Sequence, residues 1–347
     1  MKTQRFLLAL GVSLGVLLAF NTVIANVAAH SQRQQALAAL AHPPVGTPVV
    51  FLGNSLMAAG GDPNAFRSIW CAQPAAAPSL NLALSATSPV EHYLIWKTAL
   101  AHDLRPKWLI YGFFDDQLNA TARGDWSDLV GNRALSYYFP SEAAELYAPG
   151  SSLKRWQLKL TAQVPMLSER SSPWSTVERW RRQLESIGLP AKKTNRFGRV
   201  DDFGPRSAAE IASFDRRCRE ITESKVGFSA PVRQIIELAH AHQIRVLFVE
   251  MPMPRPHRES FYCLPVWPRL RNHVRQLAGE AGVTYLNASD WVIDDSQFAD
   301  ALHLNPAGAR VFSARLAREL AQLDPTKALN GEGLAHQANR PAPAPTD

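Results

Sequence analysis

Cysteine is scarce in this sequence, and the residue pattern of a metal site is missing. The 347 residues include three cysteines, Cys71, Cys218 and Cys263, but no CxxC pair and no Cys/His cluster. That absence argues against a structural metal centre, and we expect neither a metal nor a cofactor. In an oxidising compartment three cysteines allow one disulfide and leave one thiol over. The sequence leaves all three pairings open.

Acidic residues are few in one stretch, where the positive charge of the chain gathers. The formal net charge is +7, but residues 151–200 alone hold eleven Lys and Arg against three Glu, a balance of +8. Trp156, Trp174 and Trp180 lie among these charges. Basic and aromatic residues together can bind nucleic acid, but an exported protein seldom meets it, so we expect no nucleic-acid partner. Anionic glycans or lipid headgroups suit such a region better, and a solvated charged face with Trp180 in a core is the simplest alternative.

The N-terminus carries the signal that indicates export. Lys2 and Arg5 precede an apolar run at 6–20, and a weaker apolar stretch continues to residue 29. About 20 apolar residues span a membrane, and the positive-inside rule keeps the basic flank in the cytoplasm. We expect residues 1–29 to anchor the protein in the inner membrane with its body in the periplasm. Small residues near the end of the run also allow cleavage, and the protein would then be secreted.

Five short apolar runs alternate with helical patterns. The runs lie at 48–54, 80–85, 107–114, 244–251 and 283–289, and the helical patterns lie at 89–102, 231–243, 268–281 and 306–323. Near-continuous apolar runs are typical of parallel strands that are covered on both faces. The alternation predicts a three-layer α/β fold, in which ligands bind beyond the carboxyl ends of the strands.

The spacing of these elements divides the chain into segments. The interval between the third and fourth strands is far longer than a βαβ crossover needs. We expect a signal anchor at 1–29, a stalk at 30–47, the first part of the α/β domain at 48–116, a basic, mostly helical insertion at 117–224, the second part of the domain at 225–323, and a disordered tail at 324–347.

Two local patterns suggest catalysis by a serine. Ser55 follows the first strand and precedes a short helical stretch, so it is either the cap of that helix or an exposed nucleophile. Asp300 and His303 lie three residues apart, just before an Asn305-Pro306 helix start. A serine hydroxyl needs an imidazole to take its proton and a carboxylate to orient that imidazole. The three side chains together predict a catalytic triad. An α/β-hydrolase fits less well, because Met57 stands where a GxSxG motif ends.

These motifs resemble those of the SGNH (GDSL-like) hydrolase superfamily. The matching pieces are "FLGNS" after the first strand, "NLALSATSP" around the second, "YGFFDD" after the third and "DALH" before the last helix. The resemblance covers 48–116 and 225–323, and it implies a flavodoxin-like parallel sheet. It also implies Ser55 as the nucleophile with Asp300 and His303 as its partners.

The resemblance further implies an oxyanion hole, in which the chain departs from the family pattern. The backbone N–H groups of Ser55 and of Ser85 or Ala86 would serve as donors, although the family usually has glycine at the second place. Phe114 stands where the family has an asparagine whose side chain donates, and a phenyl ring cannot donate. Asn119 is a candidate replacement.

Two further residues are candidates for contact with substrate. Asn54 adjoins the nucleophile, and His257 lies in the loop after the fourth strand, where a surface histidine is the plainer alternative. The expected function is that of an extracytoplasmic, membrane-anchored serine esterase or O-acyltransferase acting on acyl esters, with acylated envelope polysaccharide as a candidate substrate. The alternative is a non-catalytic envelope protein that binds or assembles other components.

Overall fold

The structure is a computed structural model of the whole chain. It describes residues 2–29, 38, 40–70, 79–85, 87–119, 150–164, 167, 194–195, 198–199 and 206–323. Outside the described residues lie Cys71, Ala86, Trp174, Trp180 and the tail at 324–347.

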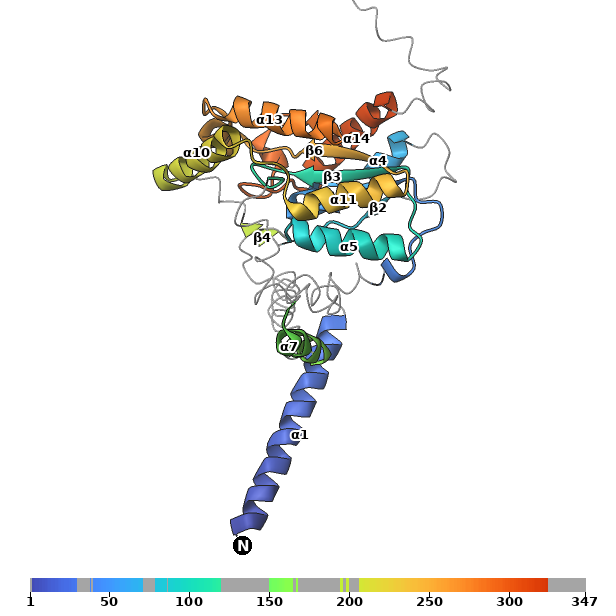
Figure 1. Ribbon diagram of the computed structural model, residues 1–347, viewed down its shortest axis with the longest axis vertical. Helices are drawn as coiled ribbons and strands as arrows, with labels where there is room; N and C mark the ends of the chain where they lie inside the picture. The colour runs from blue at the N-terminus through green and yellow to red at the C-terminus, as the bar shows by residue number, and fades with distance from the viewer. Residues whose placement is uncertain are drawn as a thin grey trace, which may run out of the picture.

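A five-stranded parallel sheet forms the centre of the molecule (Figure 1). Its strands, in spatial order, are β2 (Leu80–Asn81), β1 (Val49–Gly53), β3 (Trp108–Phe113), β6 (Arg245–Glu250) and β7 (Thr284–Asn287). The first two strands are reversed in space and the rest follow chain order. The structure therefore confirms the predicted flavodoxin-like fold, whose ligand sites lie at the carboxyl ends of the strands near that reversal.

The second strand is shorter than the apolar run at 80–85 predicted. Regular pairing ends at Asn81, but the N–H of Leu82 still donates to Phe51 and the N–H of Leu84 donates to Gly53. The chain thus follows β1 to its carboxyl end without keeping strand geometry, and Ser85 comes next.

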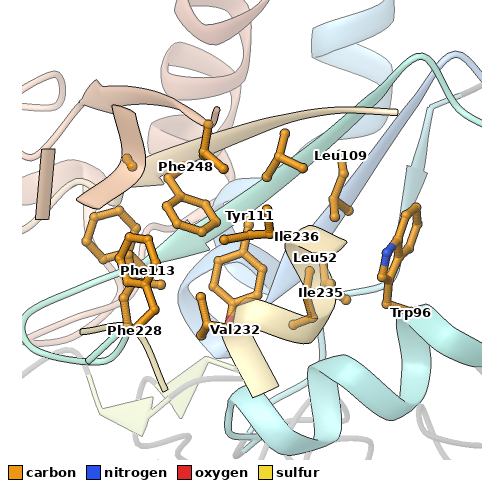
Figure 2. Packing of buried hydrophobic residues seen from close by; sticks show 14 of the residues in the cluster. Leu52, Trp96, Leu109, Tyr111, Phe113, Phe228, Val232, Ile235, Ile236 and Phe248 are labelled. Atoms are coloured by element: carbon orange, nitrogen blue, oxygen red, sulfur yellow. The ribbon is translucent and has the colours of Figure 1, made fainter. Parts of the chain in front are cut away.

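Helices cover both faces of the sheet because alternate strand residues point to opposite sides. On one face, Leu52, Tyr111 and Phe248 pack with the side chains of the helices on that side. These helices are α5 (Pro89–Ala101), α10 (Ala208–Glu223), α11 (Ala230–Ala241) and α13 (Trp267–Glu280). Figure 2 shows Val232, Ile235 and Ile236 of α11 against Tyr111, Phe113 and Phe248.

The opposite face carries the helices that position the candidate site. Phe51, Ile110 and Leu247 point to this side. They pack with α3 (Ser55–Gly60), α4 (Pro63–Trp70) and α14 (Pro306–Leu323). The helix that starts at Ser55 and the last helix therefore share one core.

Parts of the predicted stalk and insertion pack into the α/β body. Leu40, from the segment 30–47, is buried in the core of the first face. In the segment 117–224, α10 buries Phe214, Cys218 and Ile221 in that same core. The same segment contains α7 (Ser152–Gln163), which exposes large apolar side chains, and a two-stranded antiparallel ribbon of β4 (Thr194–Asn195) and β5 (Gly198–Arg199).

The N-terminal helix α1 (Lys2–Ala29) extends away from the body (Figure 1). Its stretch Gln4–Asn26 has a mean hydropathy of 2.2 and is long enough to cross a membrane. Helices of this kind serve either as anchors or as signal peptides. Of the cysteines that the structure describes, Cys218 is buried, Cys263 is exposed and the two are not bonded to each other.

Candidate active site

Ser55 stands on a tight turn at the carboxyl end of β1. Gly53 has a φ of +147°, and a Cβ there would lie 2.7 Å from the Gly112 carbonyl oxygen, so only glycine fits between the two strands. Asn54 then caps α3, because its Oδ1 accepts from the Leu56 N–H at 2.9 Å. Asn54 is the cap, and the half-buried Ser55 hydroxyl is left for another role.

Ser55, His303 and Asp300 form one hydrogen-bonded chain. Ser55 Oγ lies 2.8 Å from His303 Nε2, and His303 Nδ1 lies 2.9 Å from both carboxylate oxygens of Asp300. An ionised carboxylate only accepts, so the imidazole proton belongs on Nδ1 and Nε2 is free to accept from the serine. This arrangement can draw the proton from Ser55 while the carboxylate fixes the tautomer.

The Asp300 carboxylate is held ionised by its neighbours. Burial by itself would raise its pKa, but hydrogen bonds from the His303 ring and from the backbone N–H groups of His303 and Leu302 lower the pKa below its usual value. Asp300 is buried, so these bonds act where solvent screens them little.

Backbone hydrogen bonds join the two ends of the loop that carries Asp300 and His303. Phe298 and Leu304 form an antiparallel bridge, and the Ala299 N–H donates to the His303 carbonyl at 2.7 Å. Asn305 then caps α14, as the sequence predicted, by accepting from two backbone N–H groups of the first turn. The two catalytic candidates therefore come from one short, internally bonded loop.

Ser313 connects the end of α3, the helix that starts at Ser55, to α14, the helix that follows His303. Its hydroxyl, on α14, donates to the Gly60 carbonyl at the end of α3 and accepts from the Asp62 N–H, both at 2.8 Å. Ser313 is fully buried. The helix that starts at Ser55 is thus fixed against the helix that follows His303.

Two of the backbone donors expected for an oxyanion belong to described residues, Ser55 and Ser85. The Ser55 N–H opens α3, where a helix leaves its first N–H groups without intrahelical acceptors. Ser85 is exposed and follows directly on the bond from the Leu84 N–H to the Gly53 carbonyl. Asn81 holds this segment against α3 by donating to the Gly61 carbonyl at 2.8 Å. Ala86, the other predicted donor, lies outside the described residues.

Asn119 does not provide the side-chain donor that was expected of it. The residue is fully buried, and its amide nitrogen donates to the Val226 carbonyl at 3.1 Å. It also pairs with Phe228 in an isolated bridge. Asn119 joins the end of the β3 loop to the start of α11, which corrects the expectation that it contacts substrate.

Gln117, which the sequence did not single out, is hydrogen-bonded to the residue next to Ser55. Asn54 must direct its amide nitrogen away from the cap, and this nitrogen donates to Gln117 Oε1 at 3.2 Å. Gln117 is half-buried, and its oxygen accepts from Asn54, so its Nε2 hydrogens are not used in this contact. Asn54 is thereby engaged through both side-chain atoms, so it positions neighbours rather than substrate.

His257 is an interior residue, neither a surface histidine nor an exposed substrate contact. It ends the short helix α12 (Arg255–His257), and 3% of it is exposed. Its Nε2 lies 3.1 Å from Asp115 Oδ1, and Tyr262 donates its hydroxyl to the same oxygen at 2.9 Å. Burial, together with the Asp115 and Glu250 carboxylates, raises the pKa of Tyr262. The cluster fixes Asp115, which has a φ of +50°, directly after β3.

Among the residues that the structure describes, no group of three or more His, Cys, Asp and Glu side chains could hold a metal ion.

No protein-family model and no curated protein sequence matches the chain. Solved structures of lipases and esterases are similar to it. They include a GDSL-like lipase from Bacteroides thetaiotaomicron (12% identity, 84% of this chain and 98% of that one, TM-score 0.36). They also include a lipase/acylhydrolase from Enterococcus faecalis (10% identity, 80% of this chain and 96% of that one, TM-score 0.35). A third is the carbohydrate acetylesterase Est24 from Sinorhizobium meliloti (12% identity, 80% of this chain and 99% of that one, TM-score 0.36). The role of the site is inferred from the site's own hydrogen bonds.

Proposed function

We propose that this protein is a serine esterase or O-acyltransferase of the SGNH type. The observation that carries the proposal is the contact of 2.8 Å between Ser55 Oγ and His303 Nε2, with the Asp300 carboxylate on the opposite ring nitrogen. A serine that merely capped a helix would have no need of this pair, and Asn54 already performs the capping.

In the proposed reaction the Ser55 oxygen attacks the carbonyl carbon of an acyl ester. His303 Nε2 takes the hydroxyl proton, and Asp300 stabilises the resulting imidazolium. The carbonyl oxygen becomes an oxyanion, which accepts hydrogen bonds from the Ser55 N–H, from the N–H of Ser85 or Ala86 and from Gln117 Nε2. The ester C–O bond then breaks, and His303 returns the proton to the departing alcohol.

The acyl group now rests on Ser55 and is released in a second step. Either water or a sugar hydroxyl attacks the acyl carbon while His303 takes the attacker's proton. The bond between the acyl carbon and Ser55 Oγ then breaks, and His303 returns the proton to the Ser55 oxygen. Water gives an esterase, and a sugar hydroxyl gives an O-acyltransferase. The substrate proposed is an acylated glycan of the cell envelope, because Lys2, Arg5 and the apolar α1 favour a body outside the cytoplasm.

Covalent labelling tests this proposal directly. The full-length protein should react with a serine-directed alkyl phosphonate at one site, which mass spectrometry of a protease digest assigns to the peptide that contains Ser55. His303→Ala should abolish the reaction, because the members of a triad act as a unit. The exposed His242, on the opposite side of the sheet from the triad, gives the control His242→Ala, which should label like wild type.

A non-catalytic binding or assembly protein is the second candidate. The specific observation in its favour is Phe114, which stands where a hydrogen-bond donor is expected and packs into the core of the second face. Absence of phosphonate labelling in the folded wild-type protein would favour this candidate over the esterase.

A further inference from the structure

The helix α7 exposes a stripe of large apolar side chains to solvent. Leu153, Trp156 and Leu160 are 70%, 60% and 43% exposed. Positions three and four residues apart on a helix lie on one face, so the three side chains form a continuous stripe. Soluble proteins seldom leave such a stripe uncovered, and a contiguous apolar surface of this kind marks a contact with a partner or a membrane.

Basic side chains accompany the stripe. Arg155 and Lys159 lie one turn apart, are both exposed, and border the stripe on the side of Trp156. No acidic residue occurs in α7. An amphipathic helix with Trp and Leu on one side and Lys and Arg beside them is the pattern that lies in the headgroup region of a membrane. Tryptophan in particular favours that region.

The position of α7 relative to α1 places the stripe at the level where a membrane surface would lie. Residues 4–20 of α1 are exposed, whereas Ile24 is 4% exposed, so protein begins to cover the helix near its C-terminal end. Figure 1 draws α7 at the height of that end of α1 along the long axis of the molecule, between the apolar helix and the α/β body. The stripe and the end of the spanning stretch therefore share one level.

We propose that α7 is an interfacial helix that lies on the membrane surface beside the point where α1 emerges. Leu153, Trp156 and Leu160 enter the headgroup and upper acyl region, while Arg155 and Lys159 contact anionic lipid phosphates. The partner is the lipid surface itself. This proposal rests on the membrane anchorage proposed above, but it does not depend on any activity of Ser55.

Two contacts would then hold the body to the membrane. A single helix such as α1 leaves the attached domain free to rotate, whereas a second contact fixes its orientation by making the two associations mutually reinforcing. The carboxyl edge of the sheet, where Ser55 lies, would keep a fixed orientation relative to the bilayer.

A fluorescent label on α7 measures its depth. The full-length chain is prepared with Cys71→Ser and Cys263→Ser, while Cys218 stays because it is buried and burial raises its pKa. A single further cysteine, L160C, carries an NBD group. The protein is reconstituted in nanodiscs of phosphatidylethanolamine and phosphatidylglycerol, with or without doxyl-labelled lipids. The doxyl quencher lies near the glycerol end of the acyl chain for L160C and near its methyl end for L14C.

We expect the L160C label to shift to shorter emission wavelength and to lose at least half of its intensity with doxyl lipid. Two controls frame the result. L14C, in the middle of α1, reports whether the anchor is embedded, and E237C, exposed on α11 of the body, should remain unquenched. The thermal unfolding midpoint of each labelled variant should match that of the parent.

Three outcomes would overturn the proposal. An L160C label that is neither shifted nor quenched, beside a quenched L14C, leaves the anchor in place and refutes the interfacial helix. An L160C label that is shifted but unquenched shows that protein, a second copy or another segment of the chain, covers the stripe. If L14C is also unquenched, α1 is not embedded, and both the anchorage and the interfacial role are wrong.

The charge component has its own test. In discs without phosphatidylglycerol, the L160C label should be quenched less than in discs that contain it. The R155Q and K159Q changes, made together, should remove this difference between the two lipid mixtures. Equal quenching in both mixtures for the unaltered helix would refute the proposed contact with anionic lipid.

Discussion

Ser55 Oγ and His303 Nε2 lie 2.8 Å apart although 248 positions separate the two residues in the chain. The contact exists because β1 and the loop before α14 both end at the carboxyl edge of one parallel sheet. Asn54, Gln117 and Ser313 form hydrogen bonds near this contact, and the role of each residue can be tested separately.

Asn54 and Ser55 should respond in opposite ways to truncation. Asn54→Ala removes the cap of α3 and should lower the free energy of unfolding by about 0.5–2 kcal/mol in urea denaturation. Ser55→Ala should change it by no more than about 0.5 kcal/mol and should abolish phosphonate labelling. A large loss of stability in Ser55→Ala with activity retained would make Ser55 a structural residue.

Gln117 should contribute to the rate and little to ground-state binding. Gln117→Glu keeps the oxygen that accepts from Asn54 but removes the Nε2 donor, so kcat for a short-chain aryl ester should fall by about 10²–10³ with KM nearly unchanged. Asn119→Asp is not a suitable control, because Asn119 is buried and bonded to Val226. Phe114→Asn in the Gln117→Glu background offers a new donor and should recover part of kcat. An unaltered kcat in Gln117→Glu would exclude Gln117 from the oxyanion hole.

Ser313 should matter for stability more than its size suggests. Ser313→Ala removes one buried partner from the Gly60 carbonyl and from the Asp62 N–H, which keep a hydrogen bond to each other at 3.1 Å, so the free energy of unfolding should fall by about 0.5–1.5 kcal/mol. The matched control is Ser68→Ala on the exposed side of α4, which should stay within about 0.5 kcal/mol of wild type. Equal urea midpoints for the two variants would mean that the Ser313 bridge contributes nothing.

Acid should weaken one specific contribution to stability. The pKa of Asp300 is lowered in the folded protein, so the ionised group stabilises the fold above its unfolded pKa of about 3.9. This contribution is lost as the pH falls through the lower folded value. The difference in urea midpoint between wild type and Asp300→Asn should therefore be largest above about pH 5 and shrink below about pH 4. Asp290→Asn, at an exposed position, is the control. A difference that is independent of pH would contradict this assignment.

The membrane topology makes a cellular prediction. Because Lys2 and Arg5 precede the apolar stretch of α1, the protein should fractionate with the membrane and be degraded by protease added from its outer face. Full-length protein in the soluble cytosol, or protection from external protease in intact spheroplasts, would contradict it.

The centre of the sheet was predictable because β1, β3 and β6 are buried and therefore appear as continuous apolar runs in the sequence. The loop that carries Asp300 and His303 was predictable because these residues and Asn305 lie close together in the chain, and their spacing indicates a loop that ends in a helix cap. Both signals are local, and burial or capping leaves a direct trace in residue type.

The supporting side chains were not predictable in the same way. Asn54 and Ser55 are both good caps, and only the backbone direction after Gly53 decides between them. Gln117 and Asn119 are two positions apart in one loop, yet one reaches Asn54 and the other is buried against Val226. The sequence places His257 in a loop after the fourth strand, but its buried position is set by a contact with Asp115, 142 positions away. Contacts of this kind depend on packing between distant segments, to which residue type gives no guide.

The Ser313 bridge also bears on when the site comes into being. The chain is synthesised from its N-terminus, so β1 and Ser55 are made early, and α14 is the last helix among the described residues. Until α14 packs, Ser55 has neither its base nor the clamp on the end of its helix, and its hydroxyl is an ordinary, unreactive alcohol. In a chain that is exported as proposed, the Ser55 hydroxyl would therefore stay unreactive until α14 had been synthesised and packed, and its reactivity would report that this helix had folded.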